Sequence, residues 1–295
     1  MRALAAVAAL VLSAALAACA TAASPADGTP DPLADSVRVM SFNVRLDVAS
    51  DGPDAWPHRR DAVAAVIREA DVVGVQEATP AMLADLDARL PGFARFGTGR
   101  DADGGGEQSA VLYRKGRFRV LDGGTFWLSE MPDVPGSVGW DAALPRIATW
   151  VHLEDQRSGR AFAVVNTHFD HVGAEARRQS ARLLATRAPE IAGGLPLVVT
   201  GDMNATETSA VYRTLADAFR DARAASETPP AGPAGTWNGF EATADRRIDY
   251  VFVGGPVRVL RTATLDRTVG DVLGTDAAGF VSDHHAVAAM LAFGR

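Results

Sequence analysis

The sequence predicts an α/β sandwich, and three observations support this fold class. From Ser36 onward, short apolar runs typical of strands alternate with segments that have helical periodicity. The chain has 295 residues, 47% hydrophobic and 22% charged, which suffices for a sizeable core. No internal repeat and no second linker interrupts residues 36–295. We therefore expect a single α/β domain in that range.

The first half of the domain supplies strands and two helices. SVRVMSFNV alternates apolar and polar residues, which indicates a half-buried strand. WPHRRDAVAAVIREA predicts a helix that Pro57 can open, and DVVGVQE predicts a buried strand. AMLADLDARL predicts a second helix that stops at Pro91. SAVLYR, RFRVLDGGTFWL and RIATWVHLED follow as expected strands separated by turns.

The second half continues this alternation. FAVVNTHF and LPLVVTGDMN predict buried strands on either side of a helix over GAEARRQSARLLATRAPEIA. RRIDYVFV, PVRVLRTATL and HAVAAMLAF predict the last strands.

Polar or ionisable residues stand at one end of many of these strands. They are Asn43, Glu77, Asn166 with His168, Asp202 with Asn204, Asp283 with His284, and Asp249. In α/β folds, ligands gather where loops meet above strand ends. Burying several unpaired carboxylates separately is costly, and convergence on one divalent cation removes that cost. The pattern therefore predicts a metal site.

Each residue alone also has a plain structural interpretation. Glu77 is suited to the start of the helix that follows it, and Asp202 to a turn after Gly201. Asp249 can pair with Arg247, and His284 can be an ordinary loop histidine. The joint pattern favours a shared site over these separate interpretations.

Six short motifs together resemble the endonuclease/exonuclease/phosphatase superfamily. They are SFNV at 41–44, VQE at 75–77, NTHFD at 166–170, GDMN at 201–204, RIDYVF at 247–252 and SDH at 282–284. Their order is the family's, and they cover about residues 36–293. The superfamily includes pancreatic-type deoxyribonuclease, apurinic endonucleases, inositol polyphosphate 5-phosphatases and bacterial sphingomyelinases. GTFWLSE, PGSVGWD, PRIATW and NTHFDHVG most resemble a secreted bacterial branch.

This resemblance implies a four-layer α/β sandwich, with two packed mixed β-sheets flanked by helices. It also implies hydrolysis of a phosphoester with Mg²⁺ or Mn²⁺, since hard cations take carboxylate and amide oxygens. Glu77 is implied as the principal metal ligand, assisted by Asn43 and Asp283.

The resemblance implies catalytic roles as well. Asp202 would orient or deprotonate the attacking water, and Asn204 would donate to the phosphate or the water. His284 would contact the phosphoryl oxygens or act as base, with Asp249 holding its ring. His168 would be a second imidazole over the phosphate. Which imidazole is acid and which is base stays open.

Residues outside these roles have two interpretations each. Arg146 is placed to bind a phosphate oxygen or to form a buried ion pair. Asp170 and His171 are expected to bind substrate or a second metal, or to brace their loop. Glu107 follows a Gly-rich stretch that we expect to form a mobile rim, and His285 is left out of the site.

The N-terminus predicts export. Residues 1–18 have the charge and apolar run of a signal peptide, and LAAC ends at Cys19, the single cysteine. This tetrapeptide resembles a bacterial lipobox, so we expect lipidation of Cys19 and an extracytoplasmic, membrane-anchored protein. Plain secretion is the alternative. Residues 19–35 are small, polar and Pro/Gly-rich, as expected of a flexible tether.

Charge bears on the substrate. The net charge is -7, and Lys115 is the single lysine, so the chain lacks the basic surplus typical of duplex-DNA binders. We therefore favour a small-molecule or lipid phosphoester and keep an extracytoplasmic nuclease as the alternative. A non-catalytic surface-binding protein on the same fold is a rival of another class. We expect a monomer, and no G-x-S-x-G motif points to a serine hydrolase.

Overall fold

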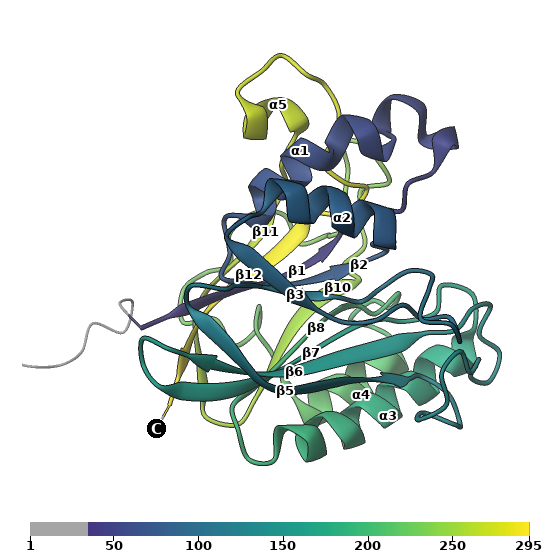
Figure 1. Ribbon diagram of the computed structural model, residues 1–295, viewed down its shortest axis with the longest axis vertical. Coiled ribbons are helices and arrows are strands. Elements are labelled where there is room, and N and C mark those ends of the chain that lie inside the picture. Colours follow the sequence, from purple (N-terminus) through teal and green to yellow (C-terminus); the bar gives the residue numbers. More distant parts are fainter. Residues whose placement is uncertain (1–34, 295) are drawn as a thin grey trace, which may run out of the picture. The chain divides into compact units, whose positions relative to one another are not determined.

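The computed structural model in Figure 1 describes residues 35–294 of the chain. The expected signal peptide, Cys19 and all but the last residue of the expected tether lie outside the described residues. Within residues 35–294, no helix is both long and apolar enough to span a bilayer.

The first sheet has six strands in the order β11-β12-β1-β2-β4-β3. It is mixed, because β1 runs parallel to β2 and antiparallel to β12. The strands are β1 Val37–Asn43, β2 Val72–Gln76, β3 Phe93–Phe96, β4 Val111–Arg114, β11 Val257–Leu265 and β12 Ala286–Phe293.

The second sheet also has six strands, in the order β5-β6-β7-β8-β10-β9. Its one parallel pair is β7 with β8. The strands are β5 Phe118–Trp127, β6 Ile147–Asp155, β7 Arg160–His168, β8 Leu197–Asp202, β9 Arg220–Asp221 and β10 Asp249–Gly254.

Helices cover the outer face of each sheet, which confirms the expected four-layer sandwich (Figure 1). Helices α1 (Trp56–Ile67), α2 (Pro80–Arg89) and α5 (Val269–Leu273) lie on the first sheet. Helices α3 (Ala174–Ala192) and α4 (Ala210–Ala218) lie on the second. A short 3₁₀ segment, η1 (Ala49–Asp54), precedes α1. The three interlayer spaces hold three buried apolar clusters, and the middle one is rich in valine from both sheets.

The two sheets approach closely beside the strand ends. Asn166 accepts a hydrogen bond from Gln76 at 2.7 Å and donates to the carbonyl oxygen of Val75 at 2.9 Å. A Cβ at Gly74 would lie 2.2 Å from Thr200 Oγ1, so a larger residue cannot fit there. Asn166, one of the polar strand-end residues, therefore serves the contact between the sheets.

Strand register brings the other polar ends to one edge. In the second sheet, Asp202 at the end of β8 is paired with His168 of β7 and with Asp249 of β10. In the first sheet, Asn43 is paired with Gln76, directly before Glu77. Paired residues in neighbouring strands project to the same face. Residues far apart in the sequence thus face one another at a shared edge.

Candidate active site

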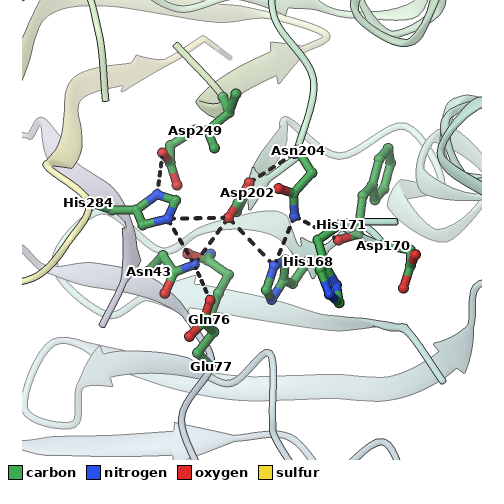
Figure 2. A network of polar contacts seen from close by, with 12 residues as sticks. Asn43, Gln76, Glu77, His168, Asp170, His171, Asp202, Asn204, Asp249 and His284 are labelled. Atoms are coloured by element: carbon green, nitrogen blue, oxygen red, sulfur yellow. Dashed lines mark hydrogen bonds and ion pairs between the residues drawn. The ribbon is translucent and has the colours of Figure 1, made fainter. Parts of the chain in front are cut away.

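Asp202 stands at the centre of a buried polar network (Figure 2). Its Oδ2 atom accepts a hydrogen bond from Asn43 Nδ2 at 3.1 Å. The same oxygen lies 3.5 Å from His168 Nε2 and 3.8 Å from His284 Nε2. Both sheets and the loop before β12 therefore meet at one carboxylate.

His284 is held by a second carboxylate. Its Nδ1 lies 2.8 Å from Asp249 Oδ2, and that oxygen also accepts from Thr236 Oγ1 at 2.6 Å. Thr236 Oγ1 in turn accepts from the backbone N–H of Asp249. This arrangement fixes the ring and leaves Nε2 directed at Asp202.

His168 and Asn204 form the opposite side of the network. Asn204 lies two residues after the end of β8 with a left-handed φ of 45°, and its backbone N–H donates to Asp202 Oδ1 at 2.9 Å. Its side-chain Nδ2 lies 3.2 Å from His168 Nε2 and donates to the carbonyl oxygen of Phe169 at 3.0 Å. The tight turn therefore aims both residues at the centre.

Glu77 follows β2 with a φ of 65°, a strained conformation for a non-glycine residue. Its Oε1 accepts from Asn43 Nδ2 at 2.9 Å, and its Oε2 accepts from the backbone N–H of Leu46 at 2.8 Å. Asn43 Oδ1 accepts from the backbone N–H of Arg45 at 3.0 Å. The side-chain amide of Asn43 thus joins Glu77 to Asp202.

Asp283 stands beside these groups, with its Oδ2 3.7 Å from Arg45 Nη1. Arg45 is itself held by Asp51 at 2.9 Å. Arg45 was not expected at the site, because its position depends on the conformation of the loop after β1.

A cavity of about 400 Å³ opens onto this network. Glu77, Asp202, Asp283 and His284 line it on one side, and Arg146, His171, Trp237 and Arg246 are among its other lining residues. The Arg246 guanidinium lies 3.9 Å from the centre of the Trp237 ring. The cavity is therefore polar at its base and has an aromatic–cationic wall.

Burial sets the protonation states. It raises the pKa of Asp202 to about 7, with a further contribution from the charge of Asp249. Burial alone would lower the pKa of His284, but Asp249, with Asp202 and Asp283, raises it to about 10. Burial and the charge of Arg146 hold the pKa of His168 well below its usual value. Near pH 7, His284 is therefore cationic and His168 neutral.

The donor set at Glu77 and Asp283 suits a hard divalent cation. Burial raises the pKa of Asp283. The charge of His284 opposes this rise, whereas the charge of Glu77 adds to it. A bound cation would relieve that repulsion and meet only oxygen ligands. Asp202, Asp249 and His284 also offer atoms within 4.8 Å of one another. Since Asp249 and His284 already bond to each other, this second set is better suited to proton transfer.

The flanking residues expected from the sequence lie together. Arg146 Nε donates to Asp170 Oδ2 at 3.3 Å, and Arg146 Nη2 lies 2.9 Å from His171 Nδ1. Asp170 Oδ1 accepts from the backbone N–H groups of Val172 and Gly173. Asp170 braces its loop, while Arg146 and His171 reach the cavity.

The side chain of Glu107 is held by an ion pair, although it follows the Gly-rich stretch that we expected to form a mobile rim. It pairs with Arg100 at 2.8 Å, and its side chain is 14% exposed. It also lines the cavity, a position that the Gly-rich sequence around it did not reveal.

A four-layer sandwich with carboxylates, amides and imidazoles at one edge is typical of phosphoester hydrolases. A model of the Endonuclease/Exonuclease/phosphatase family matches residues 40–284. The chain belongs to this family, which confirms the resemblance of its six motifs.

Solved structures agree with this assignment. An endonuclease/exonuclease/phosphatase from Bacteroides vulgatus is 39% identical, with 88% of this chain and 99% of that chain covered and a TM-score of 0.81. A mannosyl-6-phosphatase from Bacteroides thetaiotaomicron is 34% identical, with a TM-score of 0.80. The match covers 87% of this chain and 100% of that chain. The human Nocturnin catalytic domain shares the fold, with 21% identity and a TM-score of 0.66. The match covers 88% of this chain and 94% of that chain. No curated protein matches the chain.

Proposed function

We propose that this protein is a divalent-metal-dependent hydrolase of a small phosphorylated molecule, with a sugar phosphate as the favoured substrate. The observation that carries the proposal is the position of Asp202 between His284 and His168, beside Glu77 and Asp283. The similarity to a mannosyl-6-phosphatase over that protein's full length supports a sugar phosphate.

The residues divide the chemistry between them. Glu77 and Asp283 would hold Mg²⁺ or Mn²⁺, with Asn43 orienting Glu77 or adding its side-chain oxygen. The bound cation would neutralise phosphate charge and make the phosphorus a better electrophile. Arg146, whose guanidinium is fixed by Asp170 and His171, would bind the substrate's anionic group.

Asp202 is the group that would orient and deprotonate the attacking water. A pKa of about 7 suits a general base at neutral pH. Asn204 would accept a hydrogen bond from the same water through its side-chain Oδ1, since its amide nitrogen is directed at the carbonyl oxygen of Phe169 and at His168. His284, held cationic by Asp249, would donate from Nε2 to the phosphoryl oxygens and is unsuited to be the base.

A substrate panel tests the proposal. Mannose 6-phosphate, p-nitrophenyl phosphate, bis-p-nitrophenyl phosphate, sphingomyelin and plasmid DNA would be assayed with Mg²⁺, with Mn²⁺ and with EDTA. We expect turnover of the monoesters that EDTA abolishes and either cation restores. Strong DNA cutting at physiological salt without sugar-phosphate turnover would establish the nuclease alternative. No turnover together with no Mg²⁺ binding would establish the non-catalytic alternative.

We also propose that the protein acts outside the cytoplasm, anchored through an acylated Cys19. The support is the position of this single cysteine directly after a signal-peptide-like run. In a bacterial host fed labelled palmitate, the full chain should incorporate label and partition with membranes. Cys19→Ser should lose the label. An unlabelled, fully released wild-type protein would indicate plain secretion.

A further inference from the structure

A small cavity adjoins the open substrate cavity beside His168, and both are lined by Glu77, Glu107, Arg146 and His168. The small cavity has a volume of about 10 Å³, and Gln108, Arg146 and His168 line it together with Glu77 and Glu107. Gln108, Arg146 and His168 are 8%, 5% and 7% exposed. A cavity of this size has room for about one water molecule.

Three buried polar atoms of these lining residues have no hydrogen-bond partner within residues 35–294. They are Gln108 Oε1, Arg146 Nη1 and His168 Nδ1. Leaving three such atoms unpaired would be costly, because a buried donor or acceptor without a partner forfeits the hydrogen bonds it makes with water. Their presence around one small cavity therefore points to a shared polar ligand.

Neighbouring contacts decide which ring nitrogen of His168 carries the proton. The Asn204 amide donates one hydrogen to the carbonyl oxygen of Phe169, and its other hydrogen is directed at His168 Nε2. Nε2 must then be an acceptor, so the proton of a neutral ring is on Nδ1. Nδ1 faces away from Asn204 and needs an acceptor of its own.

We propose that this cavity binds one ordered water molecule, which holds His168 as the Nδ1–H tautomer and makes Gln108 a positioning residue. The water accepts from His168 Nδ1–H and from Arg146 Nη1–H, and it donates to Gln108 Oε1. These contacts give all three atoms a partner. The lone pair of His168 Nε2 then accepts from Asn204 Nδ2 at the edge of the substrate cavity.

A metal ion is a poorer occupant than water. The Arg146 guanidinium is a permanent positive charge at the cavity wall, and it would repel a second cation. Glu107 is already paired with Arg100, which reduces its value as a ligand. Water requires neither a free carboxylate nor a change in charge.

His168 then has a role that differs from that of His284. His284 has carboxylates at both ring nitrogens and is a donor, whereas His168 presents an acceptor at Nε2. In the proposed reaction, His168 accepts from the side-chain amide of Asn204 and so holds Asn204 beside Asp202. This role rests on the proposed function, but the water site and the tautomer do not.

Two measurements on the wild-type protein test the site without an activity assay. In protein labelled with ¹⁵N-histidine, two-bond ¹H–¹⁵N correlations should identify His168 as neutral and protonated at Nδ1. A crystal structure at about 1.6 Å should show a water peak within hydrogen-bond distance of the three atoms. A dry cavity or an Nε2–H tautomer would overturn the proposal, whether or not the protein is a hydrolase.

Variants of Gln108 test its positioning role. Gln108→Met keeps the side-chain length but removes the acceptor, so the tautomers of His168 should mix and kcat should fall at least about tenfold with little change in KM. Gln108→Glu keeps an acceptor oxygen and should retain most of the wild-type kcat. Gln156→Leu, at an exposed turn, is the matched control. An unchanged tautomer and kcat in Gln108→Met would contradict the proposed role.

Discussion

His284 Nδ1 lies 2.8 Å from Asp249 Oδ2, and both side chains are buried at the edge shared by the two sheets. A cationic imidazole is sustained there only because its carboxylate partner is buried with it. This pair contributes both to the acid–base chemistry of the site and to the stability of the fold. Its role can therefore be tested by unfolding experiments and by activity measurements.

The first prediction concerns Asp249→Asn. His284 has a folded-state pKa of about 10, above its ordinary value of 6.5. Its contribution to the free energy of unfolding is therefore full below pH 6.5 and is lost as the pH rises toward 10. In EDTA, urea titrations of wild type should show this loss, and those of Asp249→Asn should show a much weaker slope. Equal slopes would contradict the assignment.

The same substitution should impair catalysis. Without its carboxylate, His284 loses its fixed ring orientation and its charge at neutral pH. We expect kcat to fall about 10²–10⁴-fold, as when a general acid–base group is lost. Asp217→Asn, on the exposed face of α4, is the control and should match wild type.

The second prediction is that Asp202→Asn stabilises the metal-free protein while abolishing activity. Burial raises the pKa of Asp202 from 3.8 to about 7, so the folded state disfavours the ionised carboxylate. Wild type therefore loses stability as the pH rises from 3.8 through 7, and a neutral amide avoids this loss. At pH 8 we expect a gain of about 1–4 kcal/mol, which should nearly vanish at pH 4. A destabilised variant at pH 8 would show that the carboxylate is well solvated or fully paired.

Much of this site could be predicted from the sequence because strand ends carry it. Asn43, His168 and Asp202 each end a strand, and Asp249 begins one, so periodicity placed them near strand ends and the motif resemblance supplied their expected roles. Helices α1, α2 and α3 were also predicted, since each has an apolar stripe and two have a proline near the start.

Other features depend on tertiary structure and left little trace in the sequence. Strand β9 has two residues and α5 has five, too short for a periodic signal, and α4 and β3 were also missed. The roles of Arg45, Thr236 and Gln108 follow from loop conformations. The left-handed φ of Glu77 has no sequence signal either, because glycine is the usual residue there.

The third prediction concerns the metal. In wild type, Mg²⁺ that binds only the folded state should raise the Tm as its concentration increases. Glu77→Gln removes a charged ligand next to Asp283 and should weaken Mg²⁺ binding at least about tenfold, with loss of most of the Tm increase. Glu190→Gln, on the exposed surface of α3, serves as the control. A full Mg²⁺ response in Glu77→Gln would place the cation elsewhere, with the cluster of Asp202, Asp249 and His284 as the next candidate.

The fourth prediction concerns Arg59, a fully buried guanidinium close to the proposed metal ligand Asp283. Its Nη1 donates to the carbonyl oxygens of Val44 and Val281, both at 2.9 Å. Val44 follows Asn43, and Val281 lies two residues before Asp283, so Arg59 joins the two segments that carry these side chains. Burial lowers the pKa of Arg59 from its ordinary value, and its partners are mainly backbone carbonyls.

Arg59→Met should therefore loosen both segments together. Carbonyl oxygens left without donors should cost about 2–5 kcal/mol in urea unfolding, and Mg²⁺ affinity should fall in the protein that remains folded. Arg59→Lys keeps the charge and one nitrogen donor but lacks the Nε and Nη2 donors to the carbonyl oxygens of Asp54 and Arg45, so it should lie between Met and wild type in both measurements. If Arg59→Met loses stability but binds Mg²⁺ as tightly as wild type, Arg59 supports the fold without positioning the metal ligands.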